Sequence, residues 1–185
     1  MSQDVDRATA FVAIELMNQW VQFSRALYLS SCRGAYDSAG VKVSVAVPYV
    51  NDNESLRLAS NLFKVNPIPA GSLITHRDEP NWLDPTTLLK ALANVGASNH
   101  GTVAGALSLQ GRALRDLAPV RNFFGHRGAN TSGKVVGLHG IITNYRISPV
   151  QHPTEFCLAY EPNATRSILG TWIEDVQIIE SFACI

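Results

Sequence analysis

The chain has 185 residues, of which 46% are hydrophobic and 16% charged, and this composition excludes a disordered protein. Fifteen basic residues balance fifteen acidic ones, so no net charge attracts the chain to nucleic acid or to a membrane surface, and anion binding requires local clustering. The widely spaced Cys32, Cys157 and Cys184 include no CxxC pair and indicate neither a disulfide framework nor a zinc ribbon.

The first predicted element is a long helix over residues 4–31, where Pro and Gly are absent and apolar side chains recur at steps of three and four. Its wide apolar arc is typical of a central helix in a bundle, and Gly34 is placed to end it. Polar residues interrupt the apolar stretch and exclude a membrane span: Glu15, Asn18, Gln19, Gln22 and Arg25. The start of the chain is polar and acidic, unlike a signal peptide, so we expect a cytoplasmic protein.

Two shorter helices are predicted from the residues that begin them. Asn51 is placed to cap the first. Asp84 followed by Pro85 is placed to begin the second, which should run to about Val95. The proline-rich segment 65–81 between them is expected to form a surface loop. The valine-rich stretch 40–52 is either an extended excursion or a short strand.

A further helix is predicted over residues 99–117, with one apolar side. The side chains expected to be buried on that side are Val103, Ala106, Leu107, Leu114 and Leu117. Pro119 is expected to break or kink this helix. A fresh helical stretch can begin at Pro119 and carry residues 121–126.

The last third of the chain is less regular. Residues 131–147 fit a helix or a strand equally well, because their apolar spacing is helical and their side chains are often β-branched. Residues 149–162 are expected to form a loop with some extended character. Ser167 is placed to cap a last helix that ends near Ala183. No repeat or linker interrupts residues 1–185, so the sequence predicts a single all-α domain with long loops.

Positive charge is concentrated in one part of the chain. Between Arg112 and Lys134 five basic residues face only one acidic residue, Asp116. Such a cluster suits a phosphate backbone, although charge alone is more typical of a solvated helix face. The candidate RNA-binding residues of this cluster are Arg112, Arg115, Arg127 and Lys134.

The same cluster contains the sequence Arg-Asn-Phe-Phe-Gly-His, at residues 121–126. These side chains suit the cleavage of RNA through its own 2′-hydroxyl group. His126 is suited to moving a proton near neutral pH. Arg121 is suited to holding the scissile phosphate, and Asn122 to orienting a group by hydrogen bonding. The scheme requires no metal and no cofactor.

The spacing of Arg121 and His126 limits how they can act together. Five residues of a regular helix turn through about 500°, which leaves the two side chains about 140° apart. They converge only where Gly125 ends or bends the helix, or where a second subunit completes the site.

The segment at residues 121–126 resembles the Arg-x4-6-His signature of the HEPN superfamily, in which Asn often follows the Arg. Other stretches that resemble HEPN-like proteins are residues 14–20 and 23–25, Trp82 to Pro85, His152-Pro153 and Trp172. The resemblance implies a helical bundle that commonly dimerises and favours a helix over 131–147. It also implies a metal-independent endoribonuclease of a toxin–antitoxin or antiviral system, with Arg121, Asn122 and His126 in the active site.

The sequence thus predicts a homodimer that binds and cleaves RNA, with an antitoxin or a nucleotidyltransferase as a further partner. The alternative is a non-catalytic RNA-binding or partner-binding helical module, which other members of the superfamily exemplify. A metal site is not expected, because no pair among His100, His139, His152 and Cys157 has a recognised ligand spacing. Glu15 and Arg25 are expected to face either a site or another helix, or else to lie on an exposed strip of the first helix.

Overall fold

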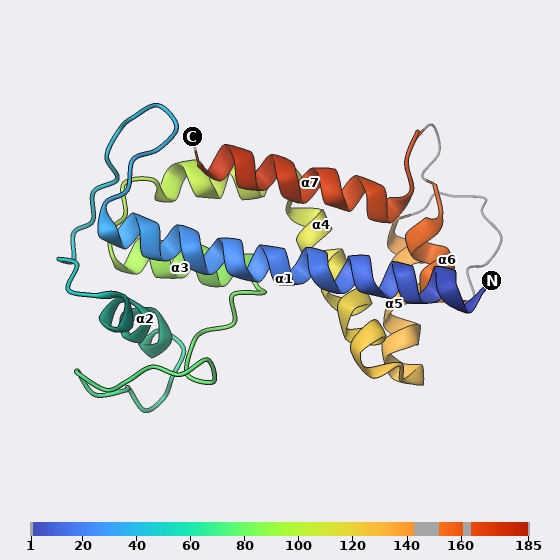
Figure 1. The fold of residues 1–185 in the computed structure, drawn as a ribbon, viewed down its shortest axis with the longest axis horizontal. Coiled ribbons are helices and arrows are strands. Elements are labelled where there is room, and N and C mark those ends of the chain that lie inside the picture. The colour runs from blue at the N-terminus through green and yellow to red at the C-terminus, as the bar shows by residue number, and fades with distance from the viewer. Residues whose placement is uncertain (1, 143–151, 161–163, 185) are drawn as a thin grey trace. The chain divides into compact units, whose positions relative to one another are not determined.

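The computed structural model describes residues 2–142, 152–160 and 164–184, and for residues 110–112 and 139–142 it describes the backbone alone. Every regular element in these ranges is a helix (Figure 1), which confirms the all-α prediction. The helices are α1 (Gln3–Arg33), α2 (Asp52–Asn61), α3 (Pro85–Asn94), α4 (His100–His126), α5 (Ala129–Ile142), α6 (Pro153–Leu158) and α7 (Ile168–Ala183). None of the described helices is both long enough and apolar enough to span a membrane.

Contacts along the backbone divide the chain into two compact units. The first unit, which we call the motif unit, comprises Met1–Gln19 and Gln110–Gln177. The second, which we call the loop unit, comprises Trp20–Leu109 and Ile178–Ile185. The helices α1, α4 and α7 each contribute residues to both units.

In the loop unit, the C-terminal half of α1 holds α2 and the long connection to α3. Tyr28 of α1 is fully buried, and its hydroxyl group donates a hydrogen bond of 2.8 Å to the carbonyl oxygen of Ser55 in α2. The ring of Tyr28 lies 5.4 Å from that of Trp82 in the connection. Glu79 accepts hydrogen bonds from Trp82 and from Arg25 of α1, at 3.0 and 2.7 Å. Arg25 therefore serves to anchor the connection to α1.

The ends of these helices follow from the capping residues that the sequence predicts. Gly34 adopts a left-handed φ of 73°, and the amide of Ala35 donates to the carbonyl of Ser30, which closes α1 with a Schellman turn. The side chain of Asn51 accepts from the amide of Glu54, and that of Asp84 from the amide of Thr86, both at 2.9 Å. The valine-rich stretch is an extended excursion with an isolated bridge from Tyr36 to Lys42.

In the motif unit, α4 runs without interruption through Pro119, so of the expected break or kink the break is wrong. Pro119 has no amide proton to donate within the helix. Its neighbours Leu117 and Val120 are fully buried, and this packing holds the helical path where local propensity opposes it. Of the stretch 131–147, which the sequence left open between helix and strand, residues 131–142 are helical in α5. Residues 143–147 lie outside the described part.

The predicted loop over 149–162 is wrong where the structure describes it, because α6 lies within it. His152 caps α6: its side chain accepts from the amide of Thr154, and Glu155 in turn accepts from the amide of His152. Pro153 follows at the first helical position. This arrangement is a capping box, with His in the place where Ser or Thr is usual. Residues 149–151, 161 and 162 lie outside the described part.

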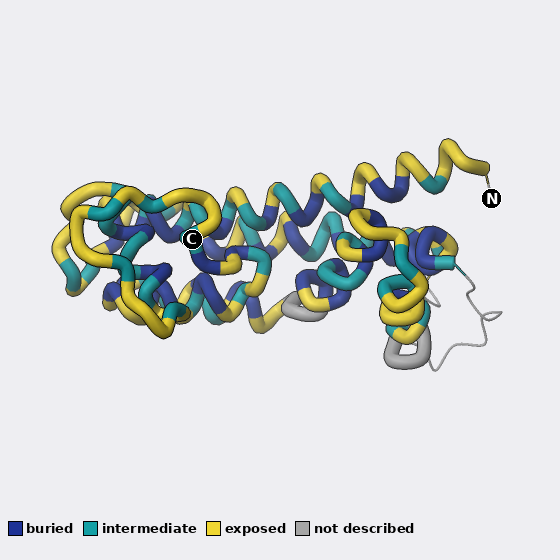
Figure 2. The backbone as a smooth tube through the Cα atoms, turned by 90° about the horizontal axis from the view of Figure 1, so that it is seen from below, coloured by how far each residue is buried: buried dark blue, intermediate teal, exposed yellow. Residues whose placement is uncertain are grey.

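Buried and exposed residues alternate along α1, the helix that begins at the end marked N in Figure 2. Leu16, Trp20 and Tyr28 are buried, as their helical spacing predicts. Phe11 belongs to the same apolar pattern, but its side chain is 67% exposed. The N-terminal part of α1 therefore presents an apolar side chain to solvent.

Candidate functional site

The residues of the predicted motif occupy the last turns of α4, in the motif unit. Phe123 and Phe124 are buried, and their rings meet edge to face with centroids 5.1 Å apart. These two aromatic side chains anchor the end of α4 in the unit's core. The side chain of His126 is exposed, as is that of Asn122, and Arg121 is half-buried.

The helix remains regular through Gly125, so the direction of each side chain follows from its position in α4. Five residues of helix separate the directions of Arg121 and His126 by about 140°. One copy of the chain thus presents these two groups on different sides of α4. Neither group takes part in an ion pair or hydrogen bond within the described part of the chain.

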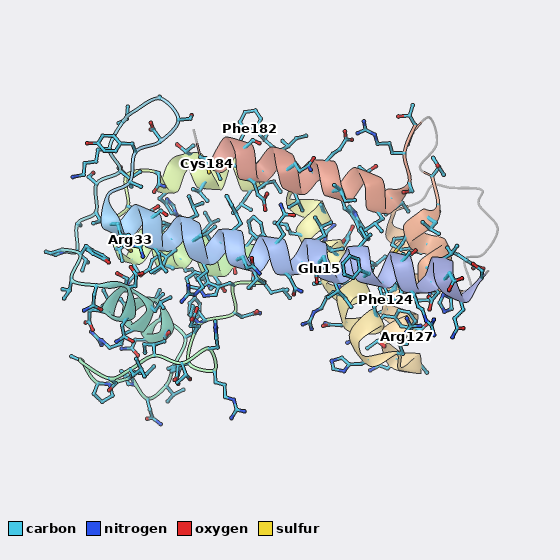
Figure 3. The ribbon with its side chains drawn as sticks, viewed as in Figure 1. Glu15, Arg33, Phe124, Arg127, Phe182 and Cys184 are labelled. Atoms are coloured by element: carbon cyan, nitrogen blue, oxygen red, sulfur yellow. The ribbon has the colours of Figure 1, made fainter. Side chains whose placement is uncertain are left out.

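The end of α4 is fixed by Arg127, the residue after the motif. Arg127 has a φ of 44°, the left-handed region that residues other than glycine seldom occupy. Its amide donates to the carbonyl of Phe123 at 2.5 Å, and its guanidinium group lies 5.8 Å from the centre of the Phe124 ring. Figure 3 shows Arg127 and Phe124 at the same end of the helix. The stacking and the hydrogen bond hold the turn that leads into α5.

Arg127 also reaches a residue near the start of the chain. Its guanidinium group donates to one carboxylate oxygen of Asp6 at 2.5 Å, and the hydroxyl group of Thr154 donates to the other at 2.5 Å. Thr154 is fully buried, and the ring of His152 beside it lies 5.6 Å from that of Phe123. We call Asp6, Arg127 and Thr154 the carboxylate lock, because one carboxylate joins α1, the end of α4 and α6.

The carboxylate lock makes the stability of the protein depend on the ionisation of Asp6. The hydrogen bonds from Thr154 and Arg127 hold the pKa of Asp6 below the ordinary aspartate value of 3.8. A carboxyl group whose pKa is lower in the folded than in the unfolded state stabilises the fold above the unfolded pKa. That contribution is lost as the pH falls through the folded pKa.

We therefore predict that Asp6→Asn lowers the free energy of unfolding near neutral pH by about 1 kcal/mol, the net contribution of a typical intramolecular hydrogen bond. The difference from the wild type should shrink as the pH falls below 3.8. Urea unfolding at a series of pH values measures both effects. Asp4→Asn is the matched control, since Asp4 lies in the same first turn of α1. An equal loss in both variants would indicate an effect of the helix dipole and not of the lock.

Acidic side chains neutralise part of the positive charge of the predicted basic cluster. Arg115 pairs with the buried Asp116 at 3.0 Å, and Arg127 belongs to the carboxylate lock. Lys134 is exposed on α5 and forms no ion pair within the described part of the chain. The side chain of Arg112 lies outside the described part. Among the described side chains, Arg121 and Lys134 therefore carry the uncompensated positive charge of this region.

Sequence reasoning missed the two hydrogen bonds that Asp6 accepts, from Arg127 and from Thr154. Asp6 is separated from Arg127 by 121 residues, and Thr154 is separated from Asp6 by 148 residues. No local spacing signals such contacts. Proline after His152 and glutamate three residues after it are the signal that could have predicted α6, the helix that brings Thr154 into place, where a loop was expected.

Among the described residues, no three His, Cys, Asp or Glu side chains form a group able to hold a metal ion. Cys157 is fully buried, and burial raises the pKa of its thiol to about 12. The side chain of His139 lies outside the described part.

No family model, no curated protein and no solved structure matches the chain. The likeness to the HEPN superfamily accordingly rests on the residues of the motif and on the stretches quoted with it.

Proposed function

We propose that the protein is a metal-independent endoribonuclease of HEPN type that acts as a homodimer. The observation that carries the proposal is the state of the motif side chains. Arg121 and His126 have no partner within the described part of the chain, and His126 is exposed beside a turn that the carboxylate lock holds in place. Unpaired polar groups on a fixed support are what a pre-organised site requires.

The proposed reaction uses the 2′-hydroxyl group of RNA as the nucleophile. His126 accepts the proton of that hydroxyl group while its oxygen forms a bond to the neighbouring phosphorus. The bond from phosphorus to the 5′-oxygen breaks, and that oxygen takes up a proton. The products are a 2′,3′-cyclic phosphate and a 5′-hydroxyl end. Arg121 neutralises the charge that develops on the phosphate oxygens, and Asn122 orients the phosphate by hydrogen bonding.

A second copy of the chain supplies what one copy lacks. Since Arg121 and His126 diverge on α4, the proposed site combines Arg121 of one copy with His126 of the other. Exposed apolar side chains on the first turns of α1 support association: Val5, Phe11 and Val12. Lys134 would contribute to RNA binding through its unpaired charge, together with Arg112 and Arg115.

The test is cleavage of a mixed set of RNAs by the purified protein in EDTA. The wild type should cut, and His126→Ala should lose about a hundred-fold or more of the rate, the usual contribution of a general base. His76→Ala is the matched control, because His76 is an exposed histidine far from the motif in sequence. Equal cleavage by the two histidine variants would contradict the enzymatic proposal. So would the absence of cleavage by all three proteins, the wild type included.

A second candidate function follows from the divergence of Arg121 and His126 on α4. If no second copy unites the diverging Arg121 and His126, the exposed motif serves as a non-catalytic surface for RNA or for a protein partner. An antitoxin or a nucleotidyltransferase is the partner class that the resemblance suggests. Retention of labelled RNA by the wild type without any cleavage in EDTA would favour this function.

A further inference from the structure

The loop unit contains a cavity of about 300 Å³ that the motif residues do not line. Its walls come from the C-terminal half of α1, the loop that follows it, the turn before α4 and the end of α7. The apolar side chains that line it are Phe23, Ala26, Leu27, Ala35, Val43 and Ala183. The volume lies at the lower limit of pockets that bind small molecules, and the lining is apolar as in such pockets.

The charged group of the cavity is Asp37, in the loop after α1. One of its carboxylate oxygens accepts hydrogen bonds from the amides of Ala39 and Val41, at 3.0 and 2.7 Å. Asp37 forms no ion pair within the described part of the chain, and the loop's lysine, Lys42, forms none either. Among the described residues, no Lys, Arg or His lines the cavity. The field inside it therefore favours a cation.

Two aromatic residues line the same cavity as Asp37. Phe23 is half-buried, and Tyr36, the residue before Asp37, is 70% exposed although it lines the cavity. Aromatic faces attract organic cations through the ring quadrupole, and a neighbouring carboxylate adds to that attraction. A tyrosine left so exposed gains burial when a ligand occupies the cavity.

Two polar side chains also line the cavity, those of Ser31 and Asn99. The Ser31 hydroxyl group donates its single proton to the carbonyl of Leu27 and accepts from the amide nitrogen of Asn99 at 2.9 Å. That contact fixes the orientation of the Asn99 amide group, whose oxygen is buried and has no hydrogen-bond partner in the described part of the chain. Both side chains are neutral, so Asp37 is the lining residue that distinguishes a cation from a neutral ligand.

We propose that this cavity binds a small organic ammonium compound with an apolar or aromatic body. The body fills the apolar walls, and the ammonium group lies at the mouth against Asp37 and Tyr36. This site does not depend on the proposed ribonuclease activity.

The test uses three probes of nearly equal shape: 2-phenylethylamine, 2-phenylethanol and phenylacetate. Their affinities are measured by titration followed in amide nitrogen–proton NMR spectra of the whole chain. The amine should bind with a Kd on the order of 1 mM, the scale for a ligand of this size. It should bind about five-fold tighter than the alcohol, and phenylacetate should bind weakest. Equal affinities, tighter binding of the alcohol or the acid, or no saturable binding of the amine would overturn the proposal.

Asp37→Asn separates the charge from the structure of the loop. Asparagine retains an oxygen for the amides of Ala39 and Val41, so the loop should keep its shape while the preference for the amine over the alcohol disappears. Asp4→Asn, on the exposed first turn of α1, is the charge control and should leave that preference intact. A preference that survives in Asp37→Asn would overturn the assignment of the cation to this carboxylate.

A substitution that fills the cavity gives a second test. Ala26 is exposed on α1 and lines the cavity, so Ala26→Phe narrows it without overpacking the core and should abolish binding of the amine. Ala8→Phe is the matched control at an exposed position of the same helix. Unchanged binding in Ala26→Phe would place the amine elsewhere and overturn the proposal.

The reactivity of the Cys184 thiol gives a third test of the cavity. It lines the cavity from the end of α7 (Figure 3), and it is exposed whereas Cys32 and Cys157 are buried. Saturating 2-phenylethylamine should slow the alkylation of Cys184 by N-ethylmaleimide about two-fold or more, with phenylacetate leaving the rate unchanged. An alkylation rate that the amine does not alter would count against this location.

Discussion

Mixing the inactive variants Arg121→Ala and His126→Ala should restore about a quarter of the wild-type rate of RNA cleavage. Random exchange makes half of the dimers mixed, and in a site built from both copies one of the two sites of each mixed dimer is intact. A site built within one copy would gain nothing from mixing. The expectation rests on the regular path of α4, which separates the two side chains by about 140°.

The measurement is the initial rate of cleavage in EDTA, after the two variants have been unfolded and refolded together. Each variant refolded alone is the control for residual activity. A mixture of His126→Ala with Asn122→Ala, another exposed position of the motif, tests whether the orienting group comes from the same copy as Arg121. A refolded mixture of Arg121→Ala and His126→Ala no faster than either variant, while the wild type is active, would show that one copy holds the complete site.

Phe156→Ala should lower the free energy of unfolding by about 3–5 kcal/mol, the range for removing a buried aromatic side chain. Phe156 is fully buried in α6, and its ring lies 5.9 Å from that of Trp172 in α7. The substitution leaves a cavity in the motif unit and removes the aromatic pair. Because α6 carries Thr154, the variant should also weaken the carboxylate lock.

Urea denaturation followed by far-ultraviolet circular dichroism gives the loss of stability. Leu158→Ala is the matched control, since Leu158 is an apolar residue of the same short helix and is exposed. It should cost less than about 1 kcal/mol. Similar losses in the two variants would mean that α6 is not packed through Phe156.

Local chemistry explains which helices the sequence predicts. Asn51, Asp84 and Gly34 act within a few residues of themselves, and the helix ends that they predict are those of the structure. Pro119 misled the prediction because its local effect is opposed by the packing of Leu117 and Val120, which no window of sequence reveals.

For the candidate site, too, the sequence could predict local features but not long-range contacts. The burial of Phe123 and Phe124 could be predicted from the motif itself, because large aromatic side chains beside polar ones seek the core. The partner of Arg127 could not, since Asp6 lies at the other end of the chain. The predicted basic cluster was counted within one stretch, and that count omitted a carboxylate brought in by folding.

The carboxylate lock lowers the positive charge that Arg127 presents to solvent. Its guanidinium group donates to Asp6 through one nitrogen and its side chain is 47% exposed, so it keeps further N–H groups that an anion can reach. An anion that binds there meets an arginine whose charge Asp6 already compensates, which weakens the attraction. The guanidinium group that maintains the turn beneath His126 is thus a poorer anion-binding group than an unpaired arginine.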